Sequence, residues 1–134
     1  LVDSNGNLVI EYSKIHLFSL LDEDKYFTAG EKISFGSYSK NINIGITICY
    51  DLRFPKLYES LSKNCHLIIN IANWPVSRID HWRTLLKARA IENQLFIVGV
   101  NRTGKDKNNL IYPYSSIIFD PKGIKCKPNF KRNI

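Results

Sequence analysis

The stretch INIGITICYDLRFP, residues 42–55, organises the chain. Its first seven residues alternate isoleucine with smaller or polar residues, which predicts a strand with one face in a core. The strand ends at Cys49, and a polar turn leads into a helical pattern over residues 56–63. A cysteine in this place has rigid surroundings, and a following helix N-terminus favours the thiolate. Cys49 is therefore a candidate nucleophile, the alternative being a small buried hydrophobe, as most free cysteines are.

Strands and helices alternate along the rest of the chain. Apolar runs over residues 65–72 and 95–100 are typical of buried strands, and a helix is predicted between them, over residues 79–93. The remaining predictions are a hairpin of residues 1–2 with 8–12, strands over 32–38 and 116–120, and a polar loop over 101–109. This order predicts an α/β domain with a mixed sheet, in which Cys49, Trp74 and Asn101 follow strand ends, where ligands bind.

The composition limits the possible classes of protein. A chain of 134 residues with 44% hydrophobic residues is one domain or part of one. No run approaches the roughly 18 apolar residues of a membrane helix, and the first residues do not resemble a signal peptide. The sequence contains no Met, so we expect a fragment or a processed chain.

Cysteine number and charge narrow the classes further. Three cysteines at irregular spacing, Cys49, Cys65 and Cys126, form neither a disulfide framework nor a zinc motif, which favours a reducing, cytoplasmic setting. The three histidines are scattered, so no metal site is expected. The net charge of +7 is compatible with an anionic substrate or with nucleic acid. Because no nucleic-acid motif accompanies it, a solvated basic surface is favoured, with a modest cluster at Lys122, Lys125, Lys127, Lys131 and Arg132.

Lys14 and Glu23 are two further candidates for chemistry. Lys14 is flanked by Ile15, Leu17 and Phe18, so it is either partly desolvated, which lowers a lysine pKa, or an edge lysine in water. Glu23 lies beside aromatic residues in an acidic loop over residues 20–30. It is either a solvated loop acid or a buried carboxylate that orients another group.

Several motifs follow one another along the chain: YSKIHLF at 12–18, CYDLRFP at 49–55, ANWP at 72–75, HW at 81–82, ARAIENQ at 88–94 and VGVNR at 98–102. Through these motifs the chain resembles the nitrilase, or carbon–nitrogen hydrolase, superfamily over about residues 1–124. The closest resemblance is to the omega-amidase-like branch, which hydrolyses 2-oxo dicarboxylic acid monoamides.

The resemblance implies a role for each candidate residue. Cys49 matches the nucleophile, Lys14 the catalytic lysine and Glu23 the auxiliary glutamate. The Lys14 ammonium and the Tyr50 backbone N–H are expected to stabilise the oxyanion, and Trp74 to wall the pocket. No cofactor is implied; the expected partner is a small-molecule amide, with no nucleic acid and no membrane, and the full-length form is expected to be a homo-oligomer.

The resemblance also implies what lies outside the chain. The family fold is an αββα sandwich, of which residues 1–134 are expected to form a single partial domain without its N-terminal part and C-terminal end. The family's general-base glutamate precedes the lysine motif by more residues than this chain has, and Glu11 is expected on the opposite face of its strand from Lys14. One sheet face is expected to be uncovered and apolar.

One departure from the family pattern leaves an alternative open. Tyr114-Ser115-Ser116 stands where the family usually has glycine, then histidine or aspartate, then serine. A bulky Tyr114 near the site is expected to narrow the pocket, which favours a non-catalytic family member that serves as a binding or assembly module. Within the superfamily, nitrilase, carbamoylase and acyltransferase reactions are the other possibilities.

Overall fold

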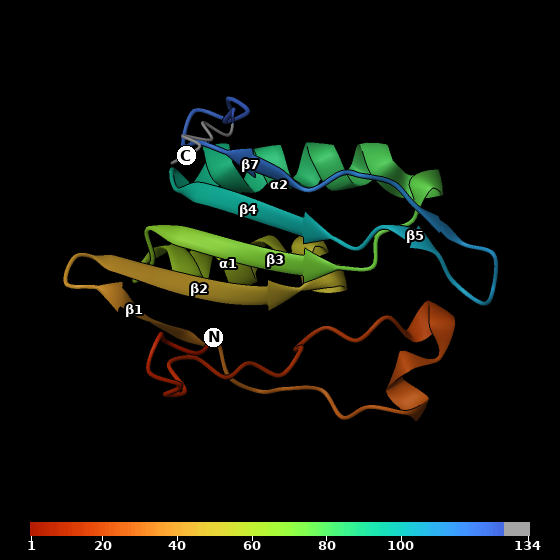
Figure 1. The fold of residues 1–134 in the computed structure, drawn as a ribbon, viewed down its shortest axis with the longest axis horizontal. Helices are drawn as coiled ribbons and strands as arrows, with labels where there is room; N and C mark the ends of the chain where they lie inside the picture. The colour runs from red at the N-terminus through yellow and green to blue at the C-terminus, as the bar shows by residue number, and fades with distance from the viewer. Residues whose placement is uncertain (128–134) are drawn as a thin grey trace, which may run out of the picture.

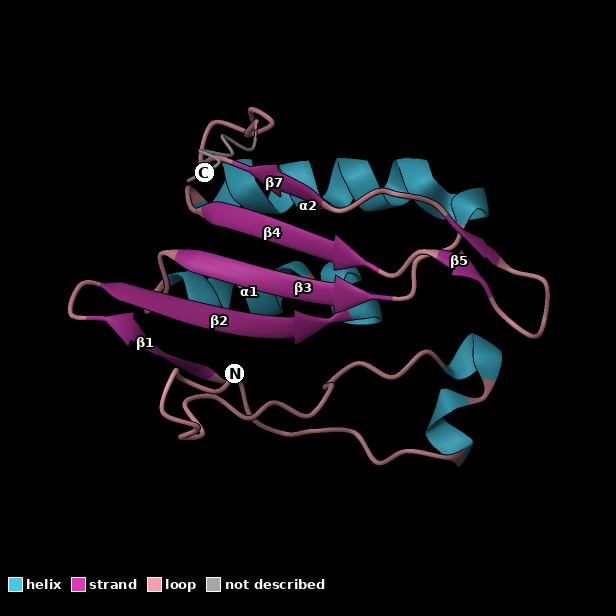
Figure 2. Cartoon of the chain, in the orientation of Figure 1, coloured by secondary structure: helices cyan, strands magenta, loops and turns pink. Residues whose placement is uncertain are grey.

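The computed structural model describes residues 1–127 and contains a five-stranded mixed sheet with two helices on one face (Figure 1; Figure 2). The three central strands are parallel, and both outer strands are antiparallel to their neighbours. This confirms the predicted mixed α/β sheet. The strand order is β1-β2-β3-β4-β7, with β1 at Phe35–Ser39, β2 at Ile42–Ile48, β3 at Leu67–Ala72, β4 at Phe96–Asn101 and β7 at Ile117–Phe119.

Helices α1, Pro55–Ser62, and α2, Ile79–Asn93, cover one face of the sheet (Figure 1). Proline begins α1, where its missing N–H needs no partner, and Gln94 ends α2 in the left-handed conformation. The two helices and the sheet face form one core, in which the buried side chains include Tyr58, Leu61, Ile68, Trp82, Leu86 and Ile97.

Gly99 allows α2 to approach the sheet closely, so Gly99→Ala is expected to lower the free energy of unfolding by about 1–3 kcal/mol. An added Cβ would lie 2.4 Å from a Leu86 methyl carbon and 2.7 Å from the Trp82 ring. Both side chains are fully buried and have no room to withdraw. Denaturant unfolding of the full-length protein measures the effect, with Thr84→Ala on the exposed side of α2 as control. An unchanged midpoint would contradict the close packing.

Among residues 1–127, no helix covers the opposite face of the sheet (Figure 1), and the side chains on this face are apolar. Its side chains come from alternate positions of β3, β4 and β7, and several are about half exposed: Ile71 at 46%, Phe96 and Val100 at 43%, and Ile118 at 40%. This confirms the expected uncovered apolar face. Contiguous apolar surface of this kind marks an interaction face, because water solvates it poorly.

Two predicted elements differ from the structure. The expected N-terminal hairpin is reduced to one isolated bridge between Val2 and Leu8, both well exposed, because the turn packs against no core. The predicted loop over residues 101–109 instead begins a short antiparallel pair, β5 at Gly104–Lys105 and β6 at Ile111–Tyr112. Short 3-10 turns complete the fold, at Ser19–Leu21, Glu23–Lys25, Cys49–Arg53 and Val76–Arg78.

Two other expectations concern the surface and the chain end. Neither helix in the described part of the chain has the length and apolar content needed to cross a bilayer. Lys131 and Arg132 of the expected basic cluster lie outside the described residues, as does most of the C-terminal segment for which no pattern was predicted. The site below is built entirely from residues 12–116.

Candidate active site

Cys49 lies at the carboxyl end of β2, as the first residue of the 3-10 turn Cys49–Arg53. Its φ of +48° is in the left-handed region, which costs a non-glycine residue about 1–3 kcal/mol. Two side chains hold the turn in place. The Asp51 carboxylate accepts the Ile48 N–H at 3.0 Å, and the buried Arg89 guanidinium of α2 donates twice to the Leu52 carbonyl, at 3.2 and 3.0 Å. Strain held in this way is typical of functional residues.

The surroundings of the sulfur correct one expectation. Helix α1 begins only at Pro55, so the helix N-terminus does not lie at Cys49. Burial raises the pKa of the Cys49 thiol, whereas the Lys14 ammonium and a hydrogen bond from the Asn73 backbone N–H act in the opposite direction. The net shift is upward, so the resting thiol is protonated and needs a base to become a nucleophile.

Lys14 is largely buried, and its ammonium is paired with Glu23. The Lys14 side chain is 9% exposed, and its Nζ lies 2.5 Å from Glu23 Oε2. The same carboxylate oxygen accepts the Phe18 N–H at 2.6 Å, so Glu23 also fixes the loop that follows Lys14. Of the alternatives left by the sequence, the geometry supports a desolvated lysine and an orienting glutamate.

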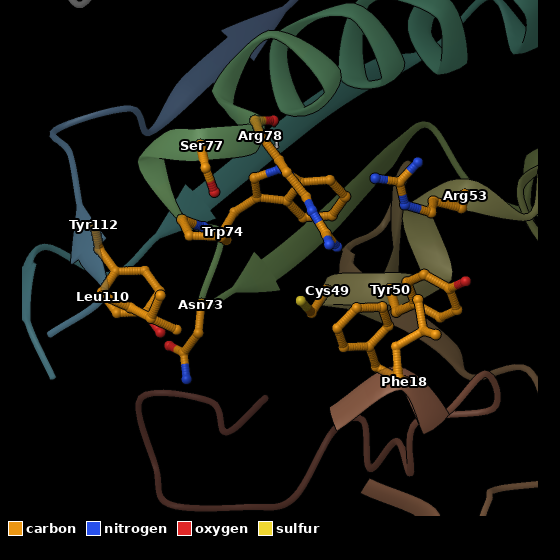
Figure 3. Close-up of a pocket in the computed structure, with 12 residues that line it drawn as sticks. Phe18, Cys49, Tyr50, Arg53, Asn73, Trp74, Ser77, Arg78, Leu110 and Tyr112 are labelled. Carbon is orange, nitrogen blue, oxygen red and sulfur yellow. Dashed lines mark hydrogen bonds between the residues drawn. The ribbon is translucent and has the colours of Figure 1, made fainter. Parts of the chain in front are cut away.

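The Cys49 sulfur faces a pocket of about 230 Å³ (Figure 3). One side consists of Phe18 and Tyr50, and the other of Asn73 and Trp74. Tyr50 and Trp74 therefore line the pocket, as the sequence analysis expected. Other lining residues, which the sequence did not single out, are Leu20, Arg53, Pro75, Ser77, Arg78, Leu110 and Tyr112.

Trp74 is held in the pocket wall by hydrogen bonds at both ends. Asn101 at the end of β4 accepts the Trp74 N–H at 2.7 Å and donates to the Trp74 carbonyl at 2.8 Å. The indole N–H donates to the Arg78 carbonyl at 2.7 Å. Because these bonds are buried or nearly so, the wall is rigid, and the neighbouring Asn73 N–H stays aimed at the sulfur.

Arg53 and Arg78 bring two positive charges to the pocket (Figure 3). The Arg53 guanidinium lies over the Trp74 ring, 5.3 Å from its centroid, and one of its nitrogens lies 3.1 Å from His81 Nδ1. The Arg78 guanidinium lies 5.6 Å from the centroid of Phe18. Arg53 lies in the stretch of residues 42–55, but only the fold shows that it shares a pocket with Arg78.

The expected effect of Tyr114 on the pocket is wrong. Tyr114 is 94% exposed and lies outside the pocket lining. Its neighbour Ser115 is buried instead, and accepts a hydrogen bond from Asn101 at 2.9 Å. The substitution therefore leaves the pocket open, and the non-catalytic alternative loses the feature that favoured it.

Within residues 1–127, no three His, Cys, Asp or Glu side chains are grouped to hold a metal ion.

Comparisons with known proteins agree with this geometry. The family model described as carbon-nitrogen hydrolase matches residues 1–129. The chain is 42% identical over 129 residues to a Staphylococcus aureus protein named hydrolase in agr operon, covering 91% of this chain and 47% of that protein. It is 40% identical over 124 residues to the 2-oxoglutaramate amidase of Bacillus subtilis, covering 92% of this chain and 47% of that protein.

A solved structure shares the fold. The crystal structure of a CN-hydrolase superfamily protein from Xanthomonas campestris, with an arsenic adduct in its active site, matches with a TM-score of 0.80 and 37% identity, over 85% of this chain and 45% of that one. The chain thus spans about half the length of the curated relatives it matches. Its sheet and two helices are the corresponding part of the nitrilase-type αββα sandwich. The chain belongs to the carbon–nitrogen hydrolase family.

Proposed function

We propose that the protein carrying this chain hydrolyses the amide bond of a small carboxylic acid monoamide, such as the omega-amide of a 2-oxo acid, and releases ammonia. The observation that carries the proposal is the Cys49 sulfur, which faces a pocket that Arg53 and Arg78 also line. Lys14 is not among the lining residues, but its ammonium acts to lower the pKa of the Cys49 thiol. The relative named 2-oxoglutaramate amidase supports this choice of substrate.

The reaction divides into two steps through a thioester. A base takes the Cys49 proton, and the sulfur adds to the amide carbonyl, whose electron pair moves onto oxygen. The Lys14 ammonium and the Tyr50 backbone N–H are the proposed donors to this oxyanion. Its collapse breaks the C–N bond, and ammonia leaves with the proton that the base took. Water, deprotonated by the same base, then adds to the thioester and expels the Cys49 thiolate, which recovers a proton as the acid departs.

The base is proposed to be the family's general-base glutamate, which precedes the lysine motif. Within this chain Glu23 is already paired with Lys14. Glu11 is exposed and lines a separate hollow with Ser13 and Lys32, away from the Cys49 pocket. Neither carboxylate is therefore placed to take the thiol proton.

The two arginines of the pocket support a substrate with a carboxylate. Guanidinium groups bind carboxylates through paired, charge-assisted hydrogen bonds. Arg53 and Arg78 line the pocket that Cys49 faces, so an acid bound to either guanidinium lies in the same pocket as the sulfur. An omega-monoamide has the required shape, with a carboxylate at one end and an amide at the other.

Arg78→Ala is expected to raise KM for 2-oxoglutaramate by about 10- to 100-fold, because a hydrogen bond to a charged group is lost. KM for a neutral amide such as butyramide should change little, since that substrate has no carboxylate to bind. Arg83→Ala, on the exposed side of α2, is the matched control for loss of a positive charge. Equal losses on both substrates would contradict a carboxylate-binding role for Arg78.

Ammonia release by the full-length protein tests the function itself. The substrates are 2-oxoglutaramate, butyramide, a nitrile and an N-carbamoyl amino acid, which separate an omega-amidase from the other reactions of the family. We expect 2-oxoglutaramate to give ammonia and the 2-oxo acid with the highest kcat/KM. Turnover of the nitrile or the carbamoyl compound alone, or of none of the four, would refute the proposal.

A further inference from the structure

Asp51 is a fully buried carboxylate two residues after Cys49. Its Oδ2 accepts the Tyr12 hydroxyl at 2.8 Å and the Ile48 N–H at 3.0 Å. Its Oδ1 accepts the His16 backbone N–H at 2.9 Å and lies 2.9 Å from the His16 ring Nδ1. Because an ionised carboxylate only accepts, Nδ1 is the protonated nitrogen of that contact.

Tyr12 and His16, whose side chains bind Asp51, lie two residues before and two residues after Lys14 in the sequence. Each is fixed by a second contact. The Tyr12 hydroxyl lies 3.3 Å from the Ile15 nitrogen, whose N–H it accepts, and the His16 ring stacks on Phe54 with centroids 3.6 Å apart. The segment that carries Lys14 is therefore attached on both sides to the turn that carries Cys49.

We propose that Asp51 is a positioning residue: through Tyr12 and His16 it sets the place of the Lys14 ammonium relative to the Cys49 sulfur. The inference rests on the proposed function, which gives Lys14 and Cys49 their catalytic roles. Its basis is that one carboxylate joins two parts of the site that are 35 to 39 residues apart in the sequence. Glu23 orients the ammonium itself, whereas Asp51 places the backbone that bears it.

The burial of Asp51 makes this connection strong. Removing this acceptor leaves donors without partners inside the protein, which favours separation of the two segments. Burial, followed by the nearby Asp51 carboxylate, raises the pKa of Tyr12, so its hydroxyl remains a donor at neutral pH. A displacement of about 1 Å between reacting groups lowers a rate by roughly 100-fold.

Asp51→Asn in the full-length protein is the first test. The amide nitrogen of asparagine would face the backbone N–H of either Ile48 or His16, so at least one of these two donors loses its acceptor. We expect kcat for 2-oxoglutaramate to fall by about 10- to 100-fold with KM changed less than about threefold. Alkylation of Cys49 by iodoacetamide at pH 8, followed on its peptide by mass spectrometry, should slow by about tenfold as Lys14 moves away.

Asp120→Asn is the matched control. Asp120 also accepts two backbone N–H groups, at 2.9 and 2.8 Å. It lies in a turn beyond β7, at the opposite end of the sheet from the carboxyl end of β2, which Cys49 follows (Figure 1). Both readouts should stay within about twofold of the unmodified protein, as expected for a change away from the site.

A pair of His16 variants tests the same contact without a change in a buried group, since the His16 side chain is 27% exposed. Asparagine places a side-chain N–H close to the position of Nδ1, whereas glutamine places it nearer Nε2. His16→Asn should therefore keep kcat and the alkylation rate within about threefold, and His16→Gln should lower both as Asp51→Asn does. This pair decides the question if Asp51→Asn does not fold.

The outcomes separate positioning from hydrolysis. The positioning role would be overturned if folded Asp51→Asn kept the alkylation rate and the kcat of the unmodified protein. Equal behaviour of the two His16 variants would overturn it as well. A fall in melting temperature with no change in kcat or alkylation rate would also overturn the positioning role, because loss of a purely structural residue has that effect. If the unmodified protein hydrolyses no amide but the variants change alkylation as expected, the proposed function fails and the positioning of Lys14 stands.

Discussion

Cys49→Ala is expected to lower kcat/KM for amide hydrolysis by about 10⁴-fold or more, since removal of a nucleophile eliminates the covalent route. Neither of the other two cysteines of residues 1–134 is placed to replace it. Cys65 is buried in the core beside Gly45, and the Cys126 N–H donates to the Ile118 carbonyl of β7. The unmodified protein, quenched during turnover, should carry the mass of the acyl group on the Cys49 peptide, and the alanine variant should carry none.

Cys126→Ser is the control for loss of a thiol, and it should leave kcat/KM within about twofold. A residual activity of Cys49→Ala above one tenth of the unmodified value would show that the sulfur is not the nucleophile. The melting temperature should change little, because alanine removes only the sulfur atom and the hydrogen bond that it accepts from the Asn73 backbone N–H.

The pH dependence of Cys49 alkylation follows from its surroundings. Burial raises the pKa of the thiol above that of a free cysteine, about 8.5. The thiolate fraction, and with it the rate with iodoacetamide, should therefore still be rising at pH values where a cysteine peptide has levelled off. A plateau below neutral pH would mean that the resting thiol is activated, against the geometry of the site.

The sequence predicted those parts of the fold that local patterns control. The alternation over Ile42–Ile48 and the helical spacing over Ile79–Asn93 gave the bounds of β2 and α2 as the structure has them. Both patterns reflect burial against one shared core. The N-terminal hairpin shortened to one bridge because Val2 and Leu8, which form it, are exposed, and only Ile10 further along is buried. A suitable turn alone therefore did not extend the pairing.

The site was predictable only where a residue type carries the chemistry by itself. Cys49 and Trp74 were placed at strand ends from the pattern. Lys14 and Glu23 were candidates with two open alternatives each, and the resemblance gave them their roles. The burial of Lys14, the joint position of Arg53 and Arg78, and the contacts of Asp51 depend on segments far apart in the chain. Tyr114 shows the same limit, since its neighbours in the sequence do not reveal that it points to solvent.

Lys14→Met is expected to lower kcat by about 100- to 1000-fold, because the oxyanion loses a preorganised donor. Methionine has nearly the same length and suits a site that is 9% exposed, so the fold should tolerate it. The released Glu23 carboxylate is 26% exposed and can be solvated, so the melting temperature should fall little. Steady-state kinetics with 2-oxoglutaramate and thermal unfolding measure both effects on the same preparation.

Glu23→Gln removes the negative charge beside Lys14 but keeps a hydrogen-bond acceptor there. The glutamine oxygen still accepts hydrogen bonds, so the Phe18 N–H and the ammonium keep a partner, and kcat should fall by only about tenfold. If Glu23 acts through Lys14, the same change in a Lys14→Met background should cost less than about twofold, since the group it orients is gone. Losses that simply multiply would show that Glu23 acts on the reaction by a route other than Lys14.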